Sequence, residues 1–195
     1  SLALNLPGPA ALMRLKAMGA RCTKAEPPSG DPMGLYMPPA YATMHDGVRV
    51  AAWDLKADKG QAALHKELAR TDVLVTSFRP SALTKLGLDW RTLRKRYPTL
   101  SLVSIVGAPA ERAEEPGHDL TYLAEAGLVP GLDLPPTLFA DMGGALMTSE
   151  AVLQAVVAQR ASGKGVAVEV ARPEAARWLA LPRTWGLTLP SGSVG

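Results

Sequence analysis

The sequence predicts an α/β protein built on an open, mostly parallel sheet of Rossmann-like type with flanking helices. Short β-like runs alternate along the chain with longer helical segments, the pattern of strand–helix–strand units with right-handed crossovers. The run from Asp72 to Ser77 has a continuous apolar centre, as expected for a strand covered on both faces. No internal repeat is evident, so the sheet is expected to belong to one domain.

Six runs have strand character, and three longer segments have helical character. Pro7-Gly8-Pro9 breaks the first strand, Gly19 ends the helix after it, and Asp58 gives the second helix an acidic start. The expected strands span 2–5, 20–25, 48–53, 72–77, 100–106 and 166–170. The expected helices span 10–18, 58–69 and 140–161, with a short helix starting at Pro80 and another capped by Asp89.

Two segments lack such a pattern. Residues 27–46 are rich in Pro, Gly and Met and are predicted to form a long loop, a kind of segment that is usually functional or mobile. Residues 183–195 are rich in Pro, Gly and Ser and are expected to be loose. We therefore predict a Rossmann-like domain over residues 1–171 and a C-terminal tail over 172–195.

The composition is globular, and the net charge of +3 is mild. The densest basic group is a solvated helix face or, alternatively, a docking patch for an anionic ligand; it comprises Arg91, Arg94, Lys95 and Arg96. A nucleic-acid partner is not expected. No apolar stretch reaches the length of a membrane span, and no signal peptide is visible, so no membrane partner is expected either.

Cys22 is the one cysteine, which excludes an intramolecular disulfide and fits a reducing, cytoplasmic location. It lies in a short β-like run and is predicted to be a small strand residue.

Common active-site motifs of α/β proteins are absent. The turn Asn5–Pro9 is not a dinucleotide-binding glycine fingerprint, and Gly163-Lys164-Gly165 lacks the rest of a phosphate-binding loop. No nucleophile elbow is present. No metal site is predicted, because the histidines show no metal-ligand spacing; they are His45, His65 and His118.

Two segments remain that could carry acid–base chemistry. His118 stands at the start of a predicted helix and could titrate near neutrality, and Asp141 stands near the positive end of the long apolar helix. Gly143 and Gly144 would let a ligand approach backbone N–H groups that stabilise an oxyanion. The alternatives are a helix N-cap for Asp141, a satisfied loop histidine for His118, and close helix packing for the glycines.

The run GHDLTYLAEAG, starting at Gly117, resembles the active-site segment of α-methylacyl-CoA racemases. The run PPTLFADMGGALM resembles the aspartate segment that these racemases share with family III CoA-transferases. Three further runs are similar to this family in the same order: LPGPAALMRLKAMGARCTKAEPPSGDP, WDLKADKGQAALHKELARTDVLVTSFRPSALTKLGLDW and QRASGKGVAVEVA. The resemblance extends from Leu4 to about Ala171.

This resemblance implies that His118 and Asp141 are acid–base groups on opposite faces of the α-carbon of a 2-methylacyl-CoA. Backbone N–H groups near Asp119 or Gly143 would then donate hydrogen bonds to the oxygen of the thioester enolate. In the transferases, the Asp141 position is instead a nucleophile that forms a mixed anhydride and then an enzyme–CoA thioester.

The resemblance also implies that Tyr122, Arg79 and Lys56 lie near coenzyme A. Coenzyme A enters as part of the substrate, and no permanently bound cofactor is expected. We favour racemisation or epimerisation, because the His of GHD serves proton transfer, whereas CoA transfer needs only Asp141.

Family members are about twice as long, and their later half supplies a small second domain and a carboxylate partner for the histidine. The stretch Gly107–Arg112 also lacks most of the family's glycines before GHD. A third hypothesis is therefore a non-catalytic CoA-binding subunit that completes its site with a partner chain.

The helix 140–161 is apolar over more than one stripe, which predicts that more than one of its faces is buried. A homodimer, or a partner chain supplying the missing half, would cover the second face. The competing prediction is that the tail from Arg172 to Leu189 folds back over the helix.

Overall fold

The computed structural model describes residues 1–109 and 112–188 and confirms an α/β fold with parallel strands. Two short strands pair in one sheet, β1 (Thr23–Glu26) with β2 (Arg49–Ala52). Three pair in another, in the order β3 (Val73–Thr76), β4 (Ser101–Val106) and β5 (Ala167–Ala171). All of these pairs are parallel, so the carboxyl ends within each sheet lie at one edge.

The first residues of the chain join the two sheets. The Leu2 N–H donates to the Val75 carbonyl of β3 at 2.8 Å, and the Ala25 N–H of β1 donates to the Ser1 carbonyl at 2.9 Å. The segment therefore lies between β1 and β3, although the prediction of a regular strand over 2–5 is wrong. The backbone leaves the extended conformation at Asn5, where φ is +62°.

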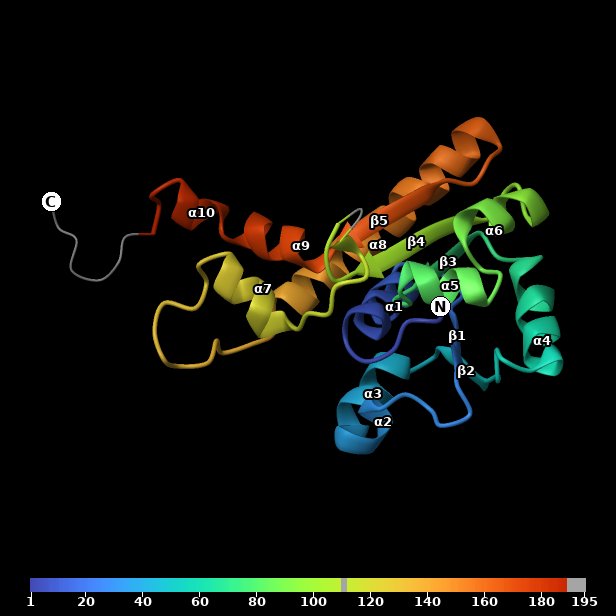
Figure 1. Ribbon diagram of the computed structural model, residues 1–195, viewed down its shortest axis with the longest axis horizontal. Coiled ribbons are helices and arrows are strands. Elements are labelled where there is room, and N and C mark those ends of the chain that lie inside the picture. The colour runs from blue at the N-terminus through green and yellow to red at the C-terminus, as the bar shows by residue number, and fades with distance from the viewer. Residues whose placement is uncertain (110–111, 189–195) are drawn as a thin grey trace, which may run out of the picture.

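Helices cover both faces of the three-stranded sheet (Figure 1). The core on one face joins alternate strand residues such as Leu74 and Leu102 to α4 (Asp58–Leu68), α5 (Pro80–Lys85) and α6 (Trp90–Arg96). The core on the other face joins Val75, Val103 and Ile105 to α1 (Pro7–Ala17) and α8 (Phe139–Ser162). This two-sided burial explains the continuous apolar run in β3.

The segment 27–46 differs from the predicted loop, because it contains α2 (Met33–Tyr36) and α3 (Pro38–His45). Pro38 and Pro39 open α3, where fixed φ angles and missing N–H groups favour a helix start. The Asp31 carboxylate accepts from the Met33 N–H at 3.0 Å and so supports the start of α2.

The segment after β5 also differs from expectation. It forms α9 (Arg172–Leu179) and α10 (Leu181–Thr184), and Figure 1 shows both beyond the end of the sheet. Helix α9 packs on α8 and on α7 (Asp119–Glu125). Residues 189–195 of the predicted loose tail lie outside the described residues. In the described ranges, no helix is both long enough and apolar enough to cross a membrane.

Gly165 permits a close approach between the turn before β5 and the start of β4. A Cβ placed there would lie 2.0 Å from the Leu100 carbonyl oxygen, so Gly165→Ala must push the strands apart. We expect a loss of about 1–3 kcal/mol in the free energy of unfolding, measured by urea denaturation. Gly131→Ala is the control, because a Cβ there meets open space. Equal stability of the two variants would contradict this account of strand packing.

Candidate functional site

The sequence-predicted site residues follow the carboxyl ends of different strands. Lys56 follows β2, Arg79 follows β3, and the segment Gly117–Asp119 lies in the connection after β4. Arg172 comes directly after β5. Ligands of open α/β sheets bind at this edge, which makes it the place to look for a site.

Asp119 ties the start of α7 to the start of α8. Its carboxylate Oδ1 accepts from the Asp141 backbone N–H at 2.8 Å. That N–H belongs to the first turn of α8, where backbone donors have no partner within the helix. Asp119 is buried, and burial raises the pKa of its carboxyl, although the bond from Asp141 opposes the rise. The helices that carry the predicted pair therefore begin side by side.

Asp141 is not the N-cap of its helix. Leu138 holds that position without a side-chain hydrogen bond, and Asp141 lies within the first turn. Its side chain is mostly buried at 15% exposure, and its Oδ1 accepts from Arg172 Nη1 at 3.1 Å. The capping interpretation of Asp141 is wrong, and its carboxylate instead forms an ion pair.

Arg172 also contacts the segment that carries the histidine. Its Nη2 donates to the Gly117 carbonyl at 3.3 Å and to the Tyr122 hydroxyl at 3.1 Å, with the guanidinium 5.0 Å from the Tyr122 ring centroid. Its Nε is buried and lacks a hydrogen-bond partner within the described ranges. One guanidinium thus bridges the residue before His118 and the Asp141 carboxylate.

His118 is the N-cap of α7, with extended backbone angles and no side-chain capping bond. It is exposed, and no hydrogen bond or ion pair of its imidazole is found among residues 1–109 and 112–188. The ring is accordingly free to meet a ligand.

The predicted oxyanion groups lie in different surroundings. A Cβ at Gly143 would meet Ala175 and Leu179 at 3.2 Å, and a Cβ at Gly144 would meet the Arg172 stem at 3.2 Å. These glycines face α9, so close packing explains why no side chain is present. Gly143 also lies beyond the first four helical N–H groups, whereas the Asp119 N–H is at the open start of α7. Asp119 therefore supplies the better-placed backbone donor.

The three residues assigned to coenzyme A are also placed differently from one another. Arg79 and Lys56 are exposed, and neither side chain forms an ion pair in the described part of the chain. Tyr122 is buried, and burial raises the pKa of its phenol, an effect that Arg172 opposes. It supports Arg172 from inside and does not face the surface.

A buried charged cluster lies beside this edge and was not predicted. Lys24, fully buried in β1, donates to Glu26 Oε1 at 3.0 Å and to His45 Nε2 at 2.9 Å, and it also pairs with Asp31. Asp31 in turn accepts the Asn5 backbone N–H at 3.1 Å and holds the turn at the sheet edge. A lysine in a short alternating run has no sequence signal that marks it as buried.

Glu26, Asp31 and His45 have metal-binding side chains within reach of one another. The Lys24 ammonium already contacts all three and takes the place that a cation would need. We therefore assign this cluster to positioning the N-terminal turn.

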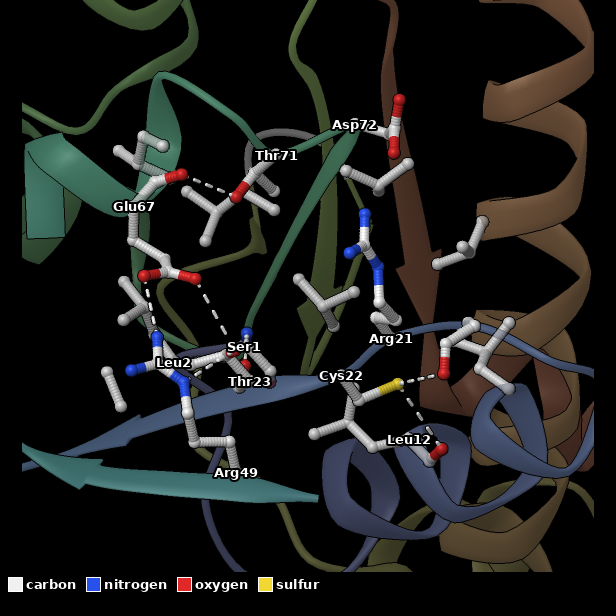
Figure 2. Close-up of a pocket in the computed structure, with 18 of the residues that line it drawn as sticks. Ser1, Leu2, Leu12, Arg21, Cys22, Thr23, Arg49, Glu67, Thr71 and Asp72 are labelled. Atoms are coloured by element: carbon white, nitrogen blue, oxygen red, sulfur yellow. Dashed lines mark hydrogen bonds and ion pairs between the residues drawn. The ribbon is translucent and has the colours of Figure 1, made fainter. Parts of the chain in front are cut away.

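A cavity of about 560 Å³ opens at the opposite edge, near the amino ends of β1, β2 and β3 (Figure 2). Cys22 lies in its wall with the thiol directed at the Leu12 carbonyl at 3.8 Å, and Arg49 pairs there with Glu67 at 2.6 Å. Burial raises the pKa of the Cys22 thiol. This cavity is separate from the edge that carries His118 and Asp141.

An α/β fold that brings the starts of α7 and α8, with His118 and Asp141, together at its carboxyl edge has the arrangement of a candidate enzyme. Comparison with known proteins identifies the family. The family model for CoA-transferase family III matches residues 1–191, and the chain belongs to this family.

Its curated relatives include both transferases and racemases. The chain is 31% identical over 160 residues to cinnamoyl-CoA:phenyllactate CoA-transferase of Clostridium sporogenes, covering 73% of this chain and 39% of the relative. It is 29% identical to human alpha-methylacyl-CoA racemase, covering 89% of this chain and 46% of the racemase. The chain thus spans about half the length of the curated relatives it matches.

Solved structures agree on the fold. A protein of Mycobacterium tuberculosis superposes with a TM-score of 0.86 at 26% identity, over 94% of this chain and 56% of that one. A CAIB/BAIF family protein from Brucella suis gives 0.85 at 25% identity, over 97% and 56%.

The buried cluster makes stability depend on pH through His45. Since Lys24 donates to Nε2, Nδ1 carries the proton and donates to the Tyr41 carbonyl at 2.6 Å. Burial lowers the pKa of His45, so below about pH 6.5 the unfolded state binds more protons and stability falls as pH falls. We expect His45→Gln to lower stability at pH 7 and to flatten its decline between about pH 7 and 5.

Urea denaturation at several pH values measures both effects. His118→Gln is the matched control, because His118 is exposed and lies outside the buried cluster, so this variant should keep the wild-type decline. The His45 account is refuted if His45→Gln keeps the full wild-type decline.

Proposed function

We propose that this chain is an acyl-CoA enzyme that racemises or epimerises the α-carbon of a 2-methylacyl-CoA, with His118 and Asp141 transferring the proton. One observation carries the proposal: the Asp119 carboxylate accepts from the Asp141 backbone N–H, so the helix start that carries the exposed His118 imidazole adjoins the helix start that carries the mostly buried Asp141 carboxylate. An imidazole and a carboxylate on adjoining helix starts suit removal of the α-proton from one face of the α-carbon and its return on the other face.

The reaction needs no redox partner. One group takes the α-proton, and the C–H electron pair moves into the thioester carbonyl to give an enolate. The other group then donates a proton to the opposite face and the carbonyl reforms. The Asp119 N–H, at the open start of α7, is the backbone donor best placed to stabilise the enolate oxygen.

Coenzyme A would enter as part of the substrate. Arg79 and Lys56 are exposed cations on the segments that follow β3 and β2, at the carboxyl ends of parallel strands, where their charges suit the phosphates of a nucleotide. Tyr122 is buried and would contribute indirectly, because its hydroxyl accepts a hydrogen bond from Arg172.

Transfer of CoA between carboxylic acids is the second candidate, and the Asp141–Arg172 ion pair favours it. The ionised Asp141 would attack the thioester carbonyl and expel CoA thiolate, leaving a mixed anhydride. The thiolate would then attack the Asp141 carbonyl carbon and release the acid as a carboxylate, leaving an aspartyl-CoA thioester. An acceptor carboxylate would reverse these steps. His118 has no part in this sequence.

Deuterium incorporation separates these candidates. With a 2-methylacyl-CoA in D2O, we expect exchange of the α-proton, detected by mass spectrometry. His118→Ala should reduce exchange by about 10²–10⁴-fold, and Asp141→Asn should abolish exchange and any CoA transfer. If His118→Ala exchanges at the wild-type rate, racemisation by this pair is ruled out.

Two further measurements complete this test. A thioester on Asp141 trapped by hydroxylamine or borohydride would support the transferase. Calorimetry with coenzyme A measures binding separately. Binding without racemisation or CoA transfer would support a non-catalytic subunit that completes its site with a partner chain. An absence of binding at millimolar CoA would count against the racemase, the transferase and the non-catalytic subunit.

Assembly is part of this proposal, because one face of α8 is open. The stripe of Phe139, Met142, Leu146, Leu153 and Val157 is 38–69% exposed along the helix. Helix α9 packs on the first turns of α8 at Gly143 and Gly144 and does not cover this stripe. Trp178 and Trp185 are also exposed, which argues against a folded-back cover. We propose that a second copy, or a partner chain supplying the remaining half, packs there.

Light scattering checks the homodimer. We expect wild type to have the mass of two chains and Leu153→Gln combined with Val157→Gln to shift it toward one, because both side chains lie on the open stripe. Arg94→Gln, an exposed position on α6 at the opposite face of the sheet, should leave the mass unchanged. A wild-type chain that scatters as a monomer would argue for a different partner chain.

A further inference from the structure

The Arg172 guanidinium joins three separate parts of the candidate site. It contacts Asp141 Oδ1 from α8, the Gly117 carbonyl from the loop before α7, and the Tyr122 hydroxyl from α7. We call this set of contacts the arginine clamp. A guanidinium is planar and its donors are fixed relative to one another, so these groups are held in one geometry.

Glycines on three segments make room for the clamp. A Cβ at Gly117 would lie 2.3 Å from the Tyr122 hydroxyl, and one at Gly107 would lie 3.0 Å from the same oxygen. A Cβ at Gly144 would lie 3.2 Å from Arg172 Cγ. Side chains at these positions would displace either the Tyr122 phenol or the Arg172 stem. The glycines therefore leave the space that these two side chains occupy.

The clamp is a poor device for stability alone. The ion pair is partly buried, and the Arg172 Nε is buried without a partner in the described ranges. Taking charges and donors out of water without complete hydrogen bonding costs folding free energy, and an apolar side chain could fill the space without that cost. The contacts are better explained by their effect on the orientation of the Asp141 carboxylate.

The clamp distinguishes the two carboxylate oxygens of Asp141. Oδ1 accepts from Arg172, while Oδ2 has no hydrogen bond among the described residues. Without Arg172, the carboxylate could turn about its last torsion and exchange these oxygens.

We propose that Arg172 is a positioning residue that holds Asp141 through Oδ1 and leaves Oδ2 as the reacting oxygen. This inference rests on the proposed function, since proton transfer and acyl transfer both require a carboxylate oxygen in a defined place. A misplacement of about 1 Å can cost roughly 10²-fold in rate. The clamp also keeps Gly117, and with it the start of the His118 segment, in register with Asp141.

The clamp itself is tested without any activity. In ¹⁵N NMR spectra, rotation about the Cζ–Nη bonds of Arg172 should be slow in wild type and fast in Asp141→Asn. Exposed Arg177, on the same helix, is the internal reference. Rapid rotation of the Arg172 guanidinium in wild type would overturn the proposal, whatever the chain catalyses.

The consequence is tested by the rate of α-proton exchange or CoA transfer. We expect Arg172→Gln to lower kcat about 10²-fold with KM unchanged, because an acting group is misplaced while substrate binding is kept. Arg172→Lys, which keeps the charge but not the planar fork, should lose less. Added guanidinium ion at concentrations that do not unfold the protein should partly restore Arg172→Gln, an effect that lost stability would not show.

Arg177→Gln is the matched control and should keep the wild-type rate. An active wild type with an unchanged kcat in Arg172→Gln, or a change confined to KM, would overturn the positioning role while the proposed function stands. A wild type without either activity, but with slow Arg172 rotation, would overturn the proposed function and leave the orientation of Asp141 standing.

Discussion

Hydrogen bonds from the first residues of the chain hold the two sheets together, and the position of the site depends on them. Ser1 and Leu2 bond to β1 on one side and to β3 on the other. Because neighbouring strands are parallel within each sheet, this link sets the loops after β1 and β2 alongside those after β3, β4 and β5. The helix starts that carry the acid–base candidates His118 and Asp141 lie together at this edge.

Two charged networks stabilise that region by different means. The Lys24 cluster is buried and anchors the turn at Asn5 through Asp31, whereas the arginine clamp is partly exposed and acts on Asp141. Removing one partner from a buried network leaves an uncompensated charge, which commonly costs about 3–5 kcal/mol. The first network is the more buried and holds the N-terminal turn, and we propose that the second acts in the chemistry of Asp141.

Asp141 takes part in both of the chemistries that we propose for this chain. A carboxylate with one oxygen held by a guanidinium can exchange a proton or attack a thioester, and the residues around it decide between these reactions. In our proposal, His118 separates the two reactions, because only proton transfer at the α-carbon would use it. The exposed stripe of α8 is the surface on which we propose that another chain packs.

The sequence by itself determined the fold class, because the alternation of strands and helices and the two-sided burial of β3 are local patterns. It also singled out His118 and Asp141, which stand at helix starts, where local chemistry leaves a signal. Only the tertiary structure showed that Asp119 caps α8, that Gly143 and Gly144 face α9, and that Lys24 is buried. The sequence assigned Arg172 to the C-terminal tail. The structure shows that it directly follows β5 and lies at the candidate site. Hydropathy and spacing report neighbours along the chain, whereas an ion pair between residues 31 positions apart exists only once the strands have been ordered.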